Sequence, residues 1–219
     1  MLYLSFDIAS RSLAFSFLFY NDNVLKNIKT IFSNKDMDIS RLESINNVIT
    51  ESIQYFYGDV VDLNAGKQMK DMILLERTIN LKNTLIELKN ALIQKQIELN
   101  LDIKDVKVLL EYQMSANYQA NSVFNQIYYE FSEFAPIIVN PCYKNKIYFS
   151  DDLMYKFFSE KYSRNYSANK AHSKENFLYF LKTFNLEHII INIKKKNLDD
   201  IADSFMQIFA YINFIKYKN

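Results

Sequence analysis

Glycine is nearly absent from this chain, whose 219 residues include only Gly58 and Gly66. A phosphate-binding P-loop and a dinucleotide-binding fingerprint each need several glycines in one short loop, because the backbone must approach the phosphates closely. Two separate glycines cannot build either loop. If the protein acts on phosphates, side-chain carboxylates with a metal ion are the leading option.

Cysteine and histidine are also scarce, with one cysteine, Cys142, and two histidines, His172 and His188. A single cysteine excludes an intrachain disulfide framework and a cysteine-based zinc site. The histidines stand far from each other and from Cys142, which argues against histidine-based metal ligation.

Long apolar runs are missing as well. None reaches the roughly 18 residues of a membrane span, and no basic-then-apolar leader precedes the first predicted strand. We therefore expect a soluble, intracellular protein without a membrane partner. A chain that is 49% hydrophobic suits one domain over residues 1–219, with a helical insertion over about 60–104.

Hydrophobic patterning predicts an α/β fold with a mixed five-stranded sheet, three antiparallel strands and then two further strands, flanked by helices. In chain order we expect strands over 2–8, 12–20 and 24–32, a helix from Asp38 to Tyr57 that stops at Gly58, a helical hairpin within 67–100, a strand over 106–111, a helix over 118–134, a strand over 137–139, and helices over 151–161, 172–184 and from 197 onward.

Two predicted strands carry an acid at their C-terminal ends, Asp7 and Glu111. The C-terminal ends of neighbouring strands converge at one edge of an open α/β sheet, where ligands bind. A buried carboxylate there is costly unless it is solvated or ligated.

The final predicted helix begins with further acids. At about 100° per residue, Asp199, Asp200 and Asp203 lie on one side of its first turn. The opposite side is apolar and carries Ile201, Phe205, Ile208, Ile212 and Ile215. A helix cap is the alternative, because Asn197 is a good N-cap and Asp200 falls where a capping box places its acid.

Positive charge is concentrated in one stretch, although the net charge is only +1. From Pro141 to Lys196 there are eleven Lys or Arg and five Asp or Glu, a local net of +6, interleaved with Tyr and Phe. Basic residues mixed with aromatics suit a phosphate backbone with exposed bases. A solvated face is the alternative.

The chain resembles the ribonuclease H-like resolvases, specifically the poxvirus-type relatives of bacterial RuvC. Four segments carry the resemblance: Phe6-Asp7-Ile8-Ala9-Ser10-Arg11-Ser12, Leu110-Glu111-Tyr112-Gln113, Ala171-His172-Ser173-Lys174 and Asp200-Ile201-Ala202-Asp203. The chain departs from the bacterial pattern at Ile8-Ala9, where Pro-Gly would stand, and in the longer stretch between its first two acids.

The resemblance implies four metal-binding catalytic carboxylates, Asp7, Glu111, Asp200 and Asp203, with Asp199 as the alternative to Asp200. It also implies a lysine at the scissile phosphate, Lys174, with Lys170 as the fallback. By the same resemblance and the local charge, we expect contacts to DNA from the following residues: Arg11, Lys144, Lys146, Lys156, Lys161, Arg164 and Lys170.

The implied activity is resolution of four-way (Holliday) junctions by paired symmetric nicks. Two Mg²⁺ ions per site, replaceable by Mn²⁺, would serve it, with no organic cofactor. Other branched DNA, RNA–DNA hybrids and a non-catalytic nucleic-acid-binding role are the alternatives. Paired nicks imply a homodimer, for which the aromatic helix over 118–134 is a candidate interface. The chain is rich in Asn, Lys, Ile and Tyr and poor in Gly and Pro, which suits an AT-rich coding genome. With the poxvirus resemblance, this suggests a virus that replicates in the host cytoplasm.

Overall fold

The structure, a computed structural model, describes residues 1–9, 12–20, 53–64, 66, 74–113, 117–150, 152–153, 156, 166–183, 185–191, 193–212 and 215. The strand expected over 24–32 and most of the helix expected over 151–161 lie outside the described residues. No helix within the described ranges is long and apolar enough to cross a membrane.

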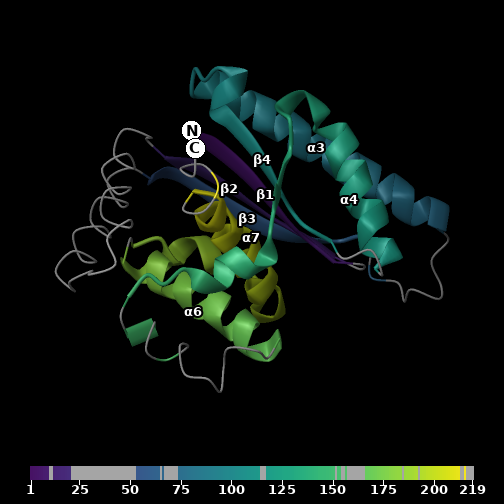
Figure 1. Cartoon of the computed structure of the whole chain (residues 1–219). Coiled ribbons are helices and arrows are strands. Elements are labelled where there is room, and N and C mark those ends of the chain that lie inside the picture. Colours follow the sequence, from purple (N-terminus) through teal and green to yellow (C-terminus); the bar gives the residue numbers. More distant parts are fainter. Residues whose placement is uncertain are drawn as a thin grey trace.

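Five strands form one mixed sheet in the order β3-β2-β1-β4-β5 (Figure 1). The strands are β1 (Leu2–Ile8), β2 (Ser12–Tyr20), β3 (Ile53–Asp62), β4 (Val106–Glu111) and β5 (Ile137–Val139). The first three strands pair antiparallel, whereas β4 lies parallel to β1 and β5 lies parallel to β4. This arrangement confirms the predicted mixed sheet of three antiparallel strands and two further strands.

The third strand differs from the sequence prediction. Residues 53–57, expected as the end of a helix, are the first half of β3, and Gly58 lies inside that strand instead of ending a helix. Apolar residues at 53 and 56 fit a helical spacing, but Tyr55, Phe56 and Tyr57 are residue types that favour a strand. Pairing with the long β2 decides in favour of the strand.

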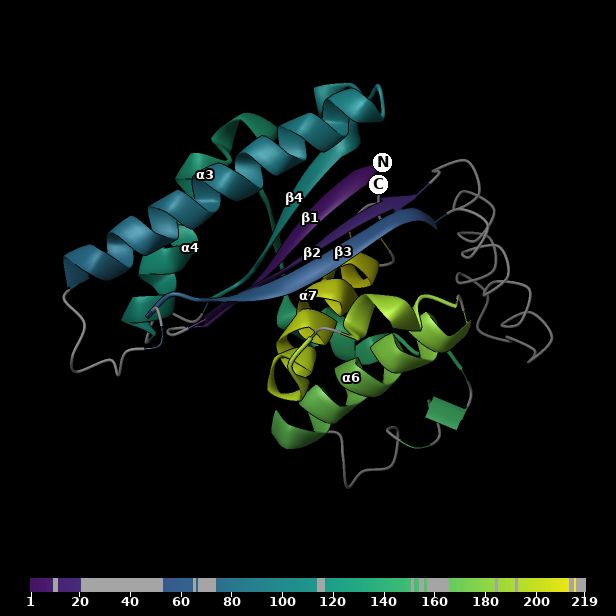
Figure 2. The same ribbon diagram turned by 180° about the vertical axis from the view of Figure 1, so that it is seen from behind.

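Helices cover both faces of the sheet (Figures 1 and 2). The helices are α3 (Leu74–Glu98), α4 (Tyr118–Glu130), α6 (Tyr166–Thr183) and α7 (Leu198–Tyr211). Short 3₁₀ helices connect them: η2 (Ile103–Asp105), η3 (Ser132–Phe134), η4 (Pro141–Lys146), η5 (Glu187–Ile190) and η6 (Lys195–Asn197). Helix α6 starts at Tyr166, six residues before the predicted 172.

One face of the sheet packs against α3 and α4. Residues 74–98 form one continuous helix and not the predicted hairpin. Its buried leucines, Leu81, Leu85, Leu88 and Leu92, follow helical spacing and join the core that Val123 and Ile127 of α4 also enter. The described part of the predicted insertion therefore contributes directly to this layer.

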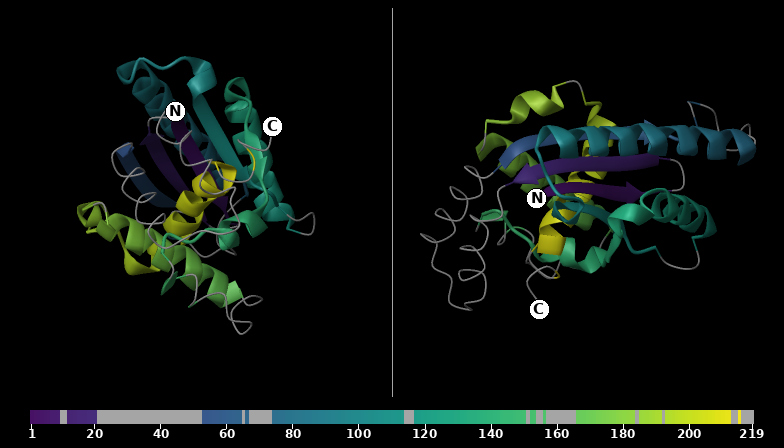
Figure 3. Two further views of the ribbon diagram at one scale, coloured as in Figure 1. Left: turned by 60° about the vertical axis from the view of Figure 1, so that its left-hand side comes forward. Right: turned by 90° about the horizontal axis from the view of Figure 1, so that it is seen from above.

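The other face packs against α7, with α6 behind it, as the views in Figure 3 show. Phe205 of α7 lies among the rings of Phe56, Phe149, Phe177 and Phe180, with ring centroids 4.7 to 6.3 Å away. Every residue of α7 from Ile201 to Tyr211 is buried. Asp203 is therefore covered by other elements, whereas Asp199 and Asp200 in the first turn stay partly exposed.

Small and polar residues let the first turns of α7 lie close to the sheet. Gly58 has no side chain, and a Cβ there would stand 3.0 Å from Ile201 Cγ2. The hydroxyls of Ser16 and Ser204 are hydrogen-bonded at 2.6 Å. Gln207 Nε2 donates to the carbonyl oxygen of Phe6 at 3.5 Å. These contacts set the position of α7 beside Asp7.

Gly58→Ala should destabilise the fold by about 1–3 kcal/mol, because the new methyl group overpacks the contact with Ile201. Urea denaturation of Gly58→Ala, Ile201→Ala and the double variant measures the coupling between the two positions. The double variant should lose less free energy of unfolding than the sum of the losses in the two single variants. Strict additivity would contradict a direct contact between strand and helix.

Candidate active site

Asp7 and Glu111 lie at one edge of the sheet. Asp7 is the penultimate residue of β1, and Glu111 is the last residue of β4. Because these strands are neighbours and parallel, their C-terminal ends point to the same edge. The first turns of α7 bring Asp200 and Asp203 to this edge, so three segments distant in sequence supply four carboxylates.

Lys170 of α6 contacts three of these carboxylates. Its Nζ lies 2.7 Å from Asp203 Oδ2, 2.8 Å from Asp200 Oδ1 and 3.6 Å from Asp7 Oδ2. Burial by itself would lower the pKa of Lys170, but Asp7 and Asp203 nearby, with the hydrogen bonds to Asp200 and Asp203, raise it instead. Lys170 therefore stays charged among these carboxylates.

Lys144 enters the same cluster from η4. Its Nζ lies 2.7 Å from Glu111 Oε2 and 3.5 Å from Asp203 Oδ1. Burial opposes the charge, yet Asp203, Asp7 and Glu111 raise the pKa of Lys144 above its usual value. Asp203 is thus shared by two ammonium groups and links the two halves of the cluster.

This environment shifts the pKa of Asp7 on β1 and the pKa of Asp203 on α7 in opposite directions. Burial raises the pKa of Asp7 to about 7, because Glu111 and Asp203 add repulsion and Lys144 and Lys170 compensate only in part. Burial also acts against ionised Asp203, but Lys144 and Lys170 outweigh it and hold the pKa of Asp203 below its usual value. Asp7 is therefore the carboxylate that most lacks a positive partner.

The donor set suits a hard divalent cation. Asp7, Glu111, Asp200 and Asp203 offer only carboxylate oxygens, which Mg²⁺ prefers, and no sulfur or imidazole ligand. As arranged, the side chains converge on ammonium groups, and no group of three or more His, Cys, Asp or Glu within the described ranges is close enough to hold a metal directly. With all four acids ionised, the two lysines leave two negative charges uncompensated, which is the charge that a divalent cation supplies.

Lys174 and Asp199 pair with each other outside this cluster, at 2.8 Å. The structure therefore brings Lys170, the fallback lysine, into contact with the carboxylates and leaves Lys174 one helical turn away. It also places Asp200, and not Asp199, on the lysine that Asp7 and Asp203 share.

The helix-cap alternative for the acids of α7 does not match the contacts. Asn197 makes no side-chain capping hydrogen bond. Its backbone N–H donates to the Lys194 carbonyl oxygen, so Asp200 does not complete a capping box. Asp200 and Asp203 accept from Lys170 instead.

His172 lies between Lys170 and Lys174 in sequence but faces elsewhere. Its ring meets the ring of Tyr148 edge-on at 4.9 Å. Burial lowers the pKa of His172 to about 4, so the imidazole is neutral at physiological pH.

The residues expected to contact DNA do not lie together on one exposed surface of the described structure. Lys144, with 8% of its surface exposed, lies within the carboxylate cluster and is paired with Glu111. Lys156 is exposed but pairs with Glu175. Arg11, Lys161 and Arg164 lie outside the described residues, as does the side chain of Lys146.

Sequence reasoning missed the place of Lys144, although a signal for it existed. Asn140 caps η4 by accepting from the Cys142 N–H, and Pro141 begins that helix. Because β5 is parallel to β4, the turn after Val139 must lie beside Glu111. A lysine in that turn is therefore close to the strand-end acid.

Asp7→Asn and Asp203→Asn should change stability in opposite directions. The folded state binds the Asp7 proton more tightly than the unfolded chain, so this group makes the free energy of unfolding fall as pH rises from about 4 to about 7. In EDTA at pH 8, Asp7→Asn should raise that free energy by up to about 4 kcal/mol, since one pKa unit corresponds to about 1.4 kcal/mol.

The lowered pKa of Asp203 has the reverse sign, so its contribution is present at neutral pH and is lost on acidification. Asp203→Asn should lower the free energy of unfolding at pH 8 by about 3 kcal/mol, because the buried Lys144 and the half-buried Lys170 lose their shared partner. Urea denaturation at pH 5 and pH 8 measures both effects. Destabilisation of both variants at pH 8 would refute the opposite roles assigned to the two aspartates.

Comparison with known proteins finds similar solved structures but no matching sequence. No protein-family model and no curated protein sequence matches the chain. Among solved structures, the fowlpox virus resolvase in complex with Holliday junction DNA is 18% identical, with 97% of each chain covered and a TM-score of 0.49. The RuvC protein of Thermus thermophilus in complex with a Holliday junction substrate is 9% identical, with 96% of this chain and 94% of that chain covered and a TM-score of 0.47. The chain is thus similar over almost its whole length to Holliday junction resolvases of a poxvirus and a bacterium.

Proposed function

We propose that this protein is a metal-dependent, structure-selective DNA endonuclease that resolves four-way junctions. The observation that carries the proposal is the meeting of Asp7, Glu111, Asp200 and Asp203 around the buried Lys144 and the half-buried Lys170 at one sheet edge. The fowlpox virus and Thermus proteins are Holliday junction resolvases with structures in complex with junction DNA, which makes the junction the first substrate to test.

The carboxylates would hold two Mg²⁺ ions, with Mn²⁺ as a substitute. Bound ions of this kind supply an activated water and a Lewis-acid contact for the leaving 3′ oxygen. Hydrolysis then forms a bond from the water oxygen to phosphorus and breaks the bond from phosphorus to the 3′ oxygen, which takes a proton. Asp7, with its raised pKa, gains most when a cation replaces the proton.

Lys170 and Lys144 have a second part in this proposal. In the described geometry their ammonium groups neutralise Asp203, Glu111 and Asp200. With a divalent cation bound by these carboxylates, both lysines would have donors available for the non-bridging oxygens of the scissile phosphate. Charge that develops there in the transition state is stabilised most by donors fixed in a buried site.

A synthetic immobile four-way junction tests the activity. The purified protein should nick it with Mg²⁺ and not in EDTA, whereas Asp203→Asn and Glu111→Gln should keep junction binding and lose nicking. Lys170→Gln should slow nicking by about 10²–10³-fold, and Lys174→Gln, one turn along the same helix, by less than about tenfold.

Denaturing gels of end-labelled strands give these rates, with binding measured in parallel by fluorescence anisotropy. Unchanged nicking by Asp203→Asn would end the assignment. Competition with a linear RNA–DNA hybrid and with a flap identifies the preferred substrate, and preference for the hybrid would replace junction resolution with another ribonuclease H-like activity.

Paired nicks need two active sites, and we assign them to a homodimer formed through α4. Tyr118 and Tyr129 are 83% and 76% exposed. They stand eleven residues apart, which is close to three full helical turns, so they lie on one stripe of α4. Phe131 and Phe134, which follow α4, are buried in the monomer and are not available to a partner.

Tyr118→Ser/Tyr129→Ser should shift the protein from dimer to monomer and leave single nicks in place of paired ones. Sedimentation velocity gives the assembly state, and a cruciform plasmid separates nicked circles from linear products. Ile97→Ser is a matched control, since Ile97 is 72% exposed on α3. A variant with both tyrosines replaced that remains dimeric would exclude this interface.

A further inference from the structure

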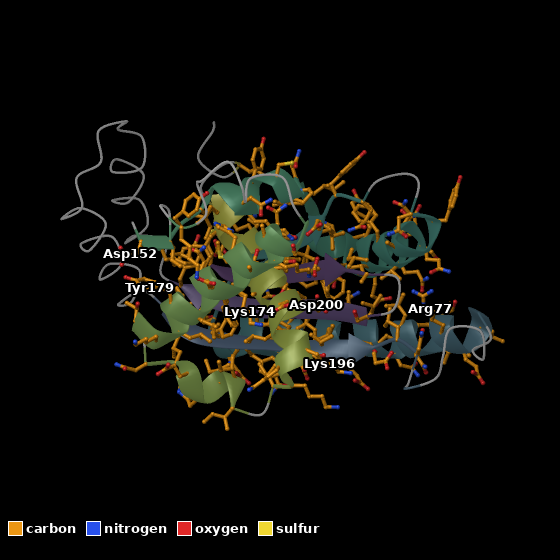
Figure 4. All side chains as sticks on the ribbon, turned by 90° about the horizontal axis from the view of Figure 1, so that it is seen from below. Arg77, Asp152, Lys174, Tyr179, Lys196 and Asp200 are labelled. Atoms are coloured by element: carbon orange, nitrogen blue, oxygen red, sulfur yellow. The ribbon has the colours of Figure 1, made fainter. Side chains whose placement is uncertain are left out.

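The segment just before α7 presents three consecutive lysines to solvent. Lys194, Lys195 and Lys196 are all exposed, and we call them the basic segment. They lie at and immediately before η6, which leads directly into the first turn of α7. Lys196 precedes Asp200 by four residues, and Figure 4, seen from below, labels both together with Lys174.

The basic segment differs from the other lysines around the site in having no carboxylate partner among the described residues. Lys144 and Lys170 lie within the carboxylate cluster, and Lys174 pairs with Asp199. Every one of these has its charge offset inside the protein. The basic segment therefore carries three positive charges that are not compensated by the described part of the chain.

The backbone of the basic segment is anchored while its side chains face outward. The Asn197 N–H donates to the Lys194 carbonyl oxygen at 2.8 Å. Ile193 on one side packs against the main core, and Leu198 on the other side is buried in it. Because both ends are fixed, the three lysines occupy a defined place relative to Asp200.

The negative charge of the carboxylate cluster explains why positive charges near it would help DNA to bind. The carboxylate cluster retains an excess of negative charge, which repels an approaching phosphodiester. Exposed charges act over about 8–10 Å at physiological salt, so lysines at the rim can offset this repulsion and hold a phosphate backbone next to the cluster.

We propose that the basic segment, Lys194 to Lys196, is a DNA-backbone contact that holds the strand entering or leaving the carboxylate site. This rests on the proposed nuclease function and specifies a surface for it. Lysines reach phosphates as flexible point charges and read no bases, so the contact is independent of sequence. It therefore serves an enzyme that selects DNA by shape.

The test uses the full-length protein with a fluorescent synthetic four-way junction and a linear duplex of the same arm sequence, in EDTA so that no strand is cut. Lys194→Gln/Lys195→Gln/Lys196→Gln should bind the junction about 100-fold more weakly at 0.1 M salt. The slope of log affinity against log salt should become shallower by about 2–3, because each phosphate contact contributes about 0.9.

Two further variants separate charge from structure. Lys194→Arg/Lys195→Arg/Lys196→Arg should keep the wild-type slope, since the charges remain. Lys89→Gln/Lys95→Gln/Lys104→Gln removes the same charge from lysines that pair with carboxylates of the chain, and should leave the slope unchanged.

A wild-type slope for the glutamine variant would overturn the proposal, as would an equal loss in the arginine variant. These results are distinct from failure of the nuclease assignment. A protein that binds the junction through the basic segment but never nicks it with Mg²⁺ would keep this inference and lose the catalytic one.

Discussion

The sharing of Asp203 between Lys144 and Lys170 is the interaction on which the rest of the site depends. A carboxylate that is only 5% exposed is tolerated because two ammonium groups reach it, and each of those is tolerated because a second carboxylate holds it. None of these charges could be buried alone. The cluster is thus a single unit built by β1, β4, η4, α6 and α7, and it requires α7 to lie directly on the sheet.

Packing provides that close approach. Gly58, Ser16 and Ser204 keep the layer between strand and helix thin, while the phenylalanine rings around Phe205 fill the space behind it. A larger residue at the sheet would lift α7 and move Asp203 away from Asp7. The apolar core and the polar cluster therefore depend on the same placement of one helix.

Much of this could be predicted from the sequence. Strands β1, β2, β4 and β5 have the predicted bounds, because each is a short apolar run ended by a turn signal. The convergence of Asp7 and Glu111 follows from parallel neighbours, and the register confirms it. Local sequence patterns predicted the wrong secondary structure where it is decided by pairing with a strand that is distant in sequence. Residues 53–57 combine a helical spacing of apolar residues with residue types that favour a strand, and pairing with β2 selects the strand.

Lysines were harder to assign than acids for a physical reason. Strand ends and a helix start fix the acids, whereas Lys144 and Lys170 reach the cluster on long side chains from elements whose relative placement is a tertiary property. Lys170 and Lys174 lie on neighbouring turns of one helix, so spacing alone could not choose between them. The packing of α6 against α7 makes the choice.

The order of the elements, with α7 after all five strands, has a consequence for biosynthesis. A ribosome makes β1, β4 and most of the sheet long before it makes residues 198–211, and until then Asp7 and Glu111 have neither Asp203 nor a covering helix beside them. Nascent or prematurely terminated polypeptides accordingly have an incomplete set of carboxylates. The carboxylate cluster can therefore assemble only after residues 198–211 have been made and have packed onto the sheet.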